Sequence, residues 1–301
     1  MRELWAVTCY FNPAHYERRY RNYRIFRDHL RVPLVTVELS CGEDSFQLHE
    51  KDADLLIQRR CPDVLWQKER LLNIGLAALP GHCDCVAWLD CDVVFEEDDW
   101  ARKVCSLLDE FPVVQPYTRV YELASTETLG GIRGDGTEGI SILRAPPGLL
   151  SKDMRGDFRV NSGLAWAARK DVLNQSGLYD ACILGSGNRA IVCAQMGQFE
   201  EAIKYLRMNK PWAEHYLQWA RHHYRQIRGG LGAVDGRILH LWHGDLRNQR
   251  YRDRHVALSE FGFNPQYDVA LDDQRCWRWN SPKMAMHRYV EAYFASRKED
   301  G

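Results

Sequence analysis

The chain has 301 residues, of which 45% are hydrophobic and 27% are charged, a balance typical of globular proteins rather than of disordered or membrane-spanning chains. Its 40 lysines and arginines nearly match its 41 aspartates and glutamates, so the overall charge does not indicate a polyanionic partner. No apolar run approaches the ~20 residues that span a membrane, and no signal-peptide pattern opens the sequence, so we expect a soluble protein without a membrane anchor.

Strand and helix patterns alternate through the first 120 residues. Strands are predicted at 4–11, 33–40, 53–60, 86–95 and 111–117, and helices at 15–30, 66–81 and 98–111. This order predicts an α/β fold with a mixed, mostly parallel sheet flanked by helices. Because ligands of such sheets bind beyond the carboxyl ends of the strands, polar residues that follow a buried strand are the first candidates for a site.

The second half of the sequence is less regular. Residues 129–139 are rich in glycine, and we predict that the segment 125–160 is a lid over a site. A strand leading into a helix is predicted at 160–173, and a helical region at 190–228. The tail from residue 262 is predicted to end in an amphipathic helix that packs back on the core.

Cysteine usage indicates the compartment. The ten cysteines include no CxxC pair, and most have apolar neighbours, which fits a reducing cytoplasm better than a disulfide framework. We therefore expect a cytoplasmic protein. "HCDC" at 82–85, together with Cys91, offers soft metal ligands, but strand alternation turns Cys91 away from the neighbouring aspartates and disfavours a zinc site.

The segment "VAWLDCDVVF", residues 86–95, combines an apolar strand with two carboxylates near its end. Side chains alternate along a strand, so Asp90 and Asp92 are predicted to face the same side. Two like charges at this distance repel each other unless a positive group lies between them. The segment is therefore either a solvated strand end or a site for a metal ion that carries a ligand.

Four blocks in this order resemble the GT-A family of nucleotide-sugar-dependent glycosyltransferases, in its family 2-like form. "WLDCDVVF" is similar to the DxD motif, and "WQKERLLNIGL" to the preceding helix that carries donor contacts. "VNSGLAWAARKDVLNQSGLYDACILGSGNRAI" is similar to the acceptor block, and "LHLWHGD" to the late histidine segment. The resemblance implies a Rossmann-like GT-A catalytic domain at 1–255, with a nucleotide-sugar half (1–120) and an acceptor half (121–255). Residues 256–301 would form a helical C-terminal extension.

The resemblance also implies a metal-dependent transfer from a nucleoside-diphosphate sugar, most commonly a UDP-sugar, to a hydroxyl acceptor. Mn²⁺ or Mg²⁺ would bridge the diphosphate and stabilise the leaving group. Asp92 would bind the ion directly and Asp90 would contact it through water or contact the ribose. His243 would supply an imidazole, with His240 as the alternative. The implied donor contacts are Thr8, Tyr10, Asn12, Lys68, Arg70, Asn73 and Asp90.

On the acceptor side, the resemblance implies contacts from Asn161, Gly163 and Trp166. Inverting members carry an acidic general base in the glycine-rich turn, but here "GSGNRA" places Asn188 there. An amide cannot accept a proton at neutral pH. The enzyme is therefore retaining, uses another base such as Asp180, or has lost its base and turns over poorly; the sequence leaves all three open.

Other interpretations of the aspartate pair remain open in the sequence. A haloacid-dehalogenase-like phosphatase would use Asp90 as its nucleophile, and a nucleotidyltransferase would hold a metal and a nucleotide with Asp90 and Asp92. The segment "YERRYRNYRIFR", residues 16–27, interleaves arginine and tyrosine as single-stranded nucleic-acid surfaces do. A modified nucleic acid therefore joins glycans and small molecules as a candidate acceptor.

Overall fold

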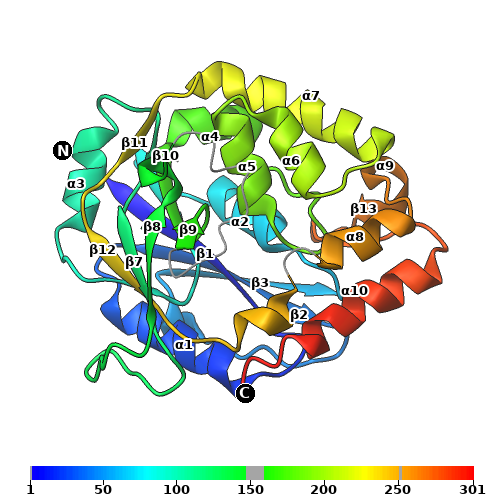
Figure 1. The fold of residues 1–301 in the computed structure, drawn as a ribbon, viewed down its shortest axis with the longest axis horizontal. Coiled ribbons are helices and arrows are strands. Elements are labelled where there is room, and N and C mark those ends of the chain that lie inside the picture. Colours follow the sequence, from blue (N-terminus) through cyan, green and yellow to red (C-terminus); the bar gives the residue numbers. More distant parts are fainter. Residues whose placement is uncertain (1, 147–158, 251–252) are drawn as a thin grey trace.

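A computed structural model of the chain describes residues 2–146, 159–250 and 253–301 (Figure 1). Within these ranges the main sheet has seven strands in the order β11-β6-β10-β4-β1-β2-β3. The neighbours from β3 to β4 are parallel, whereas β10 runs antiparallel to both β4 and β6. Their bounds are β1 (Leu4–Phe11), β2 (Leu34–Cys41), β3 (Leu55–Cys61), β4 (Cys85–Leu89), β6 (Val113–Gln115), β10 (Ala165–Arg169) and β11 (Leu231–Ala233).

A smaller sheet lies against the end of the first. Its order in the described part of the chain is β5-β12-β7-β8-β9, and a separate hairpin pairs β13 with β14. The bounds are β5 (Val93–Phe95), β7 (Arg119–Glu122), β8 (Thr137–Ser141), β9 (Arg159–Asn161), β12 (Arg237–His240), β13 (Val269–Leu271) and β14 (Trp277–Trp279). Because β4 belongs to the large sheet and β5 to the small one, the turn that joins them lies where the two sheets meet.

Helices lie on several sides of the sheets. In Figure 1, α4 to α7 gather at the top of the molecule, whereas α1 and α10 lie at the bottom. The bounds are α1 (Glu17–His29), α2 (Lys68–Ala77), α3 (Trp100–Leu107), α4 (Lys170–Ser176), α5 (Gly187–Gln195), α6 (Phe199–Tyr205), α7 (Lys210–Ile227), α8 (Asp253–Glu260), α9 (Pro265–Asp268) and α10 (Met284–Ser296). Leu71 and Leu72 of α2 are buried against the parallel strands, as their helical spacing predicts.

The predicted α/β class with a mostly parallel sheet is confirmed. One predicted element was wrong in detail. Residues 86–95 form two strands, because β4 stops at Leu89 and a turn at 90–92 leads into β5 of the other sheet. The predicted helical region 190–228 is confirmed, and it is divided into α5, α6 and α7.

The structure describes only part of the predicted lid at 125–160. Residues 147–158 lie outside the described residues, so the lid stays a prediction. Within 125–146, the carboxylate of Glu127 accepts hydrogen bonds from the amides of Arg133 and Gly134 at 2.8 and 2.9 Å and from the Tyr121 hydroxyl at 2.8 Å. This carboxylate therefore organises the glycine-rich turn before β8.

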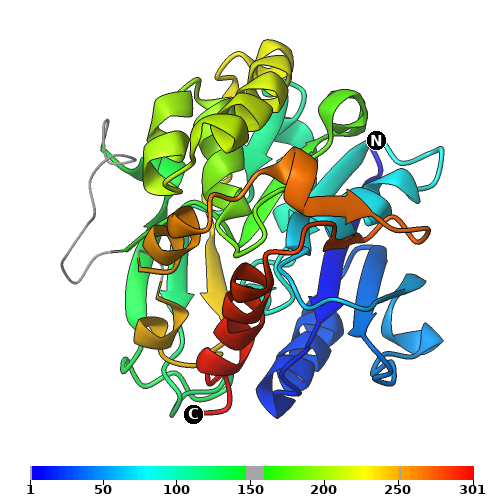
Figure 2. The same ribbon diagram turned by 90° about the vertical axis from the view of Figure 1, so that its right-hand side faces the viewer.

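The segment after residue 255 shares the core of the preceding part. Met286, Val290, Tyr293 and Phe294 of α10 belong to the same buried cluster as residues of β1 and α2. Figure 2 shows α10 and the end of the chain close to α1. All ten cysteines are free, and no helix among the described residues is long and apolar enough to cross a membrane.

Candidate active site

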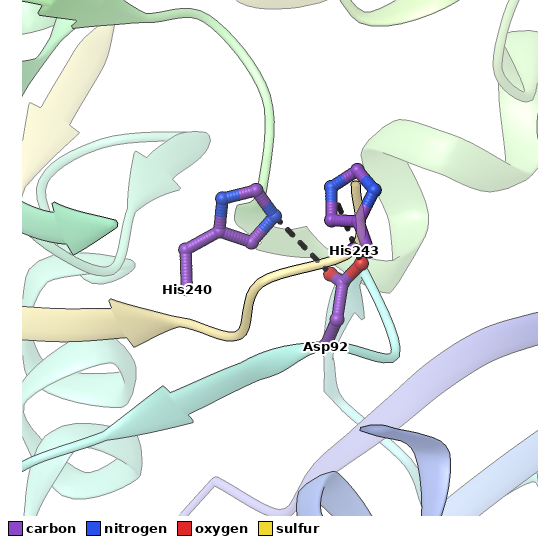
Figure 3. A group of neighbouring side chains, drawn as sticks. All are labelled: Asp92, His240 and His243. Atoms are coloured by element: carbon purple, nitrogen blue, oxygen red, sulfur yellow. Dashed lines mark ion pairs between the residues drawn. The ribbon is translucent and has the colours of Figure 1, made fainter. Parts of the chain in front are cut away.

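Three potential metal ligands come together at the end of β4, where the two sheets meet (Figure 3). Asp92 lies in the turn after β4, His240 ends β12, and His243 follows three residues later. The Asp92 carboxylate oxygens lie 3.6 Å from His240 Nε2 and 3.9 Å from His243 Nε2. The ligand atoms all lie within 4.8 Å of one another, so one ion can contact all three. We call Asp92, His240 and His243 the metal group.

The charges within the metal group are coupled. Burial raises the pKa of Asp92, but the two imidazoles outweigh this effect and hold its pKa well below the usual range. Burial lowers the pKa of His240, yet the Asp92 carboxylate beside it raises that pKa overall. Burial lowers the pKa of His243 to about 4, so His243 stays neutral at pH 7. A neutral imidazole and an ionised carboxylate are the forms that bind metal ions.

The metal group fits a divalent cation. Asp92 Oδ1 is buried and has no hydrogen-bond partner in the described structure, although a buried acceptor usually has one. Two imidazoles and one carboxylate suit Mn²⁺ better than Mg²⁺, which prefers an all-oxygen shell. The same donor set also occurs at mononuclear non-haem iron sites. When bound, such an ion would act as a Lewis acid toward a phosphate oxygen.

Asp90 lies beside the metal group but has a different partner. It forms an ion pair with Lys68 in the first turn of α2. Burial raises the pKa of Asp90, although the Lys68 ammonium opposes this. The prediction that Asp90 and Asp92 share one side of a strand was wrong, since both follow the end of β4 in a turn. Asp90 is therefore absent from the three-residue metal group.

A closed series of contacts surrounds the end of β4, and we call it the β4 rim. The Asp90 amide donates to the Leu164 carbonyl at 2.7 Å, and Gly163 precedes Leu164. A Cβ atom on Gly163 would lie 2.5 Å from Asn188 Nδ2, so Asn188 packs directly on this glycine. Glu69, next to Lys68, packs in the same way on Gly187, next to Asn188. The β4 rim therefore consists of Asp90, Lys68, Glu69, Gly187, Asn188, Gly163 and Leu164.

Residues 297–301 support the metal group from outside. The Arg19 guanidinium donates two hydrogen bonds to the Glu299 carboxylate, at 2.7 and 2.8 Å, and a third to the Phe11 carbonyl at 3.0 Å. A Cβ atom on Gly244 would lie 2.8 Å from the Lys298 carbonyl oxygen, so the segment after His243 packs against this tail. Arg19 is also close enough to Asp92 to lower the pKa of its carboxyl.

Three predicted donor contacts are engaged inside the protein. Thr8 is fully buried, and its hydroxyl donates to the Leu89 carbonyl at 2.8 Å. The Tyr10 hydroxyl, also buried, donates to Gln47 at 2.6 Å. Asn12 accepts from the Tyr16 amide at 3.0 Å and donates to the Tyr16 carbonyl at 2.9 Å. In this structure these side chains brace the ends of β1 and β4, and direct donor contact remains a prediction.

Arg70, Asn73 and Asp180 form a separate cluster. Both Arg70 NH1 and Asn73 Nδ2 lie 3.0 Å from Asp180 Oδ2. All three line an open pocket of about 620 Å³ with residues of α7, among them His215 and Trp219. The predicted donor contacts Arg70 and Asn73 thus meet the predicted alternative base Asp180, and none of the three belongs to the metal group.

The predicted acceptor residues differ in accessibility. Trp166 is 2% exposed, and its indole donates to the Ser162 carbonyl at 3.0 Å, so it serves as core. Asn161 is partly exposed in β9, and its Nδ2 is buried without a hydrogen-bond partner. Gly163 and Asn188 contact each other in the β4 rim. They belong to separate segments of the chain, and both were predicted to lie on the acceptor side.

The arginine- and tyrosine-rich segment 16–27 is largely neutralised. Ion pairs link Arg19, Arg21, Arg24 and Arg27 to acidic partners, and Tyr23 is fully buried. The alternation of arginine and tyrosine therefore reflects helix packing and surface ion pairs. This observation does not favour a nucleic-acid acceptor.

Two residues that the sequence did not single out lie in or beside this site. His240 was only an alternative to His243, although both flank Asp92. Glu69 was not singled out, because it stands between Lys68 and Arg70 in a segment selected for its leucines. The one available signal was its place in the first turn of a helix that precedes the aspartate pair.

No protein-family model and no curated protein matches this chain. Among solved structures, S. aureus TarS 1–349 is 8% identical over 98% of this chain and 71% of that chain, with a TM-score of 0.43. Mycobacterium tuberculosis glucosyl-3-phosphoglycerate synthase, in complex with Mn²⁺, UDP and phosphoglyceric acid, is 12% identical over 90% of this chain and 82% of that chain, with a TM-score of 0.40. Likeness at this level does not establish a shared family.

Proposed function

We propose that this protein is a metal-dependent glycosyltransferase that uses a nucleoside-diphosphate sugar, with UDP-sugars favoured. The observation that carries the proposal is the metal group at the carboxyl end of β4, where ligands of parallel sheets bind. Asp92, His240 and His243 would hold Mn²⁺, which supplies Lewis-acid stabilisation of a leaving diphosphate. The Lys68–Asp90 ion pair would hold the start of α2 against the turn that carries Asp92.

The sequence blocks add support to this assignment. The DxD-like segment, the acceptor-like block and the late histidine segment are far apart in the chain, yet Asp92, Asn188 and His243 lie around the same strand end or its rim. The proposed acceptor is a hydroxyl compound, either a glycan or a small molecule.

A thermal-shift panel tests the proposal. UDP, GDP, CDP and ADP are each added with and without Mn²⁺, with Mg²⁺ and Fe²⁺ as comparison metals. A ligand that binds only the folded state stabilises it by about 2.7 kcal/mol at a hundredfold excess over its Kd. We expect one nucleotide, UDP first, to stabilise the protein only with Mn²⁺.

The Asp92→Ala variant should lose this response, whereas Asp98→Ala, at an exposed position six residues along, should keep it. If no nucleotide stabilises the wild type with any metal, the glycosyltransferase assignment is wrong. Stabilisation by Fe²⁺ alone, without any nucleotide effect, would identify an iron site in its place.

A further inference from the structure

Glu69 is a buried carboxylate beside the candidate active site that the metal group does not use. It is the second residue of α2, and only 2% of its surface is exposed. Its carboxylate accepts a hydrogen bond from its own backbone amide and is attracted by the Lys68 ammonium, which is itself paired with Asp90. Among the described residues no ion pair is formed by Glu69 itself, although buried charged groups are normally paired.

The position of this carboxylate is defined by Gly187, the first residue of α5. A Cβ atom on Gly187 would lie 2.2 Å from Glu69 Oε1 and 2.7 Å from Oε2. No side chain larger than hydrogen fits at residue 187 while Glu69 stays in place. The carboxylate therefore lies between the starts of α2 and α5. Lys68 precedes Glu69 in α2, and Asn188 follows Gly187 in α5.

The backbone on both sides of this position is held in an unusual conformation. Ser186 and Leu164 adopt positive φ angles of 67° and 70°, which non-glycine residues rarely do. The Ser186 hydroxyl is fixed by Arg254 at 2.6 Å and by His255 at 3.0 Å. Strained backbone of this kind persists where the surroundings enforce it, and it is concentrated at functional sites.

Charged groups from each neighbouring element influence Glu69. Burial raises the pKa of Glu69 to about 7, and the Lys68 ammonium opposes that rise. Asp90 from the turn after β4 and Asp180 from the segment before α5 add to the rise. Cys9 of β1 and Cys182 also lie close, and burial keeps both thiols neutral by raising their pKa.

On the basis of the proposed function, we propose that Glu69 is the general base of the transfer reaction. Its carboxylate takes the proton from the acceptor hydroxyl while that oxygen forms a bond to the anomeric carbon of the donor. The bond from the anomeric carbon to the phosphate oxygen breaks, and its electron pair leaves with the nucleoside diphosphate. The products are the glycoside, the nucleoside diphosphate and protonated Glu69, and the anomeric configuration is inverted.

This assignment accounts for an amide at residue 188. Asn188 cannot take a proton, but it packs on Gly163 and directly follows Gly187, on which the Glu69 carboxylate packs. The acceptor turn has no carboxylate at residue 188. In this proposal α2 supplies one, Glu69, and Gly187 leaves the space that the Glu69 carboxylate occupies. Asp180, the alternative base by sequence, is paired with Arg70 and Asn73.

Hydrolysis of UDP-glucose and UDP-N-acetylglucosamine tests the assignment without a known acceptor, because water then supplies the hydroxyl. UDP release is measured with Mn²⁺ from pH 5 to 9, and UDP·Mn²⁺ affinity is measured by calorimetry for each variant. We expect Glu69→Gln to lower turnover at least 100-fold, within the range for loss of a general base, with the UDP Kd changed less than threefold. The matched control Glu200→Gln, at an exposed position in α6, should be unchanged.

The wild-type rate should fall as the pH drops below about 7, because Glu69 must be ionised to act, and Glu69→Gln should lose this dependence. Gly187→Ala, which keeps the carboxylate but displaces it, should lower turnover with UDP affinity retained. Carboxyl ¹³C NMR of the wild type should show one glutamate titrating near pH 7 that is missing from Glu69→Gln.

Three results overturn the assignment while leaving the proposed function intact. In the first, Glu69→Gln turns over within threefold of the wild type. In the second, the wild type binds UDP·Mn²⁺ but releases no UDP from the sugar nucleotides. In the third, the carboxyl NMR signal of Glu69 titrates near pH 4. Absence of UDP·Mn²⁺ binding by the wild type would instead be failure of the proposed function itself.

Discussion

Lys68 and Asp90 form an ion pair that joins the first turn of α2 to the residue that follows β4. Lys68 is 9% exposed, so its ammonium has little access to water and depends on this carboxylate. The pair fixes the start of α2 beside the metal group, and it thereby also places Glu69, the next residue, against α5.

Lys68→Met should therefore destabilise the protein by roughly 3 kcal/mol, because removal of one partner leaves a partly buried carboxylate unpaired. Urea unfolding at pH 7 measures the effect. The matched control is Lys210→Met, since Lys210 is 86% exposed and lies 4.0 Å from Glu214; it should change stability by less than about 0.5 kcal/mol. Equal stability of the two variants would contradict a structural role for the Lys68–Asp90 pair.

His223 of α7 should make stability dependent on pH. Burial lowers its pKa to about 3, and its Nδ1 lies 2.7 Å from the Ser176 hydroxyl. Between about pH 6.5 and pH 3 the unfolded state binds a proton that the folded state does not, so the free energy of unfolding falls as the pH falls, by up to about 1.4 kcal/mol per pH unit.

Urea unfolding at pH 7, 5.5 and 4.5 measures this slope. His223→Gln should give a shallower slope than wild type, whatever its stability at pH 7, whereas His29→Gln at an exposed position should leave the slope as it is. A slope unchanged in His223→Gln would show that other groups carry the pH dependence.

The Arg19–Glu299 pair should link stability to metal affinity. Only 1% of the surface of Glu299 is exposed. Burial raises the pKa of its carboxyl, but Arg19 and Arg297 outweigh this effect and hold the pKa well below the usual range. Glu299→Gln should cost about 3 kcal/mol, since it removes the carboxylate that pairs with the largely buried Arg19 guanidinium.

The same variant should weaken Mn²⁺ binding about tenfold, in the lower range for outer-shell partners of metal ligands, because the tail packs on the segment after His243. Calorimetric Mn²⁺ titration below the unfolding temperature separates this effect from stability, and Glu291→Gln on the exposed side of α10 is the control. Unaltered Mn²⁺ affinity would reduce the tail to a purely structural element.

The sequence predicted the parallel half of the fold well because strand and helix periods alternate clearly there, and β1 was located at its observed bounds. It failed where neighbouring residues belong to different sheets. The turn at 90–92 breaks the alternation that was assumed for Asp90 and Asp92, and nothing in "DCDVV" marks the change of sheet.

The candidate site was predictable only in part for a related reason. Asp92 and His243 follow apolar strands, and position after a strand is visible in a sequence. Glu69 depends on the approach of two helices, and that approach depends on Gly187, 118 positions later. Thr8 and Trp166 show the converse, since the family resemblance implied ligand contact but both side chains are buried.

The central claim is that one divalent ion, bound by Asp92, His240 and His243, holds a nucleoside diphosphate at the end of β4. A crystal structure of the protein with UDP and Mn²⁺, with anomalous data collected at the manganese edge, tests it most directly. We predict one strong anomalous peak at about 2.0–2.3 Å from oxygen and nitrogen atoms of these three side chains, with diphosphate oxygens completing the shell. A manganese peak elsewhere, or UDP bound away from Asp92, would contradict the account.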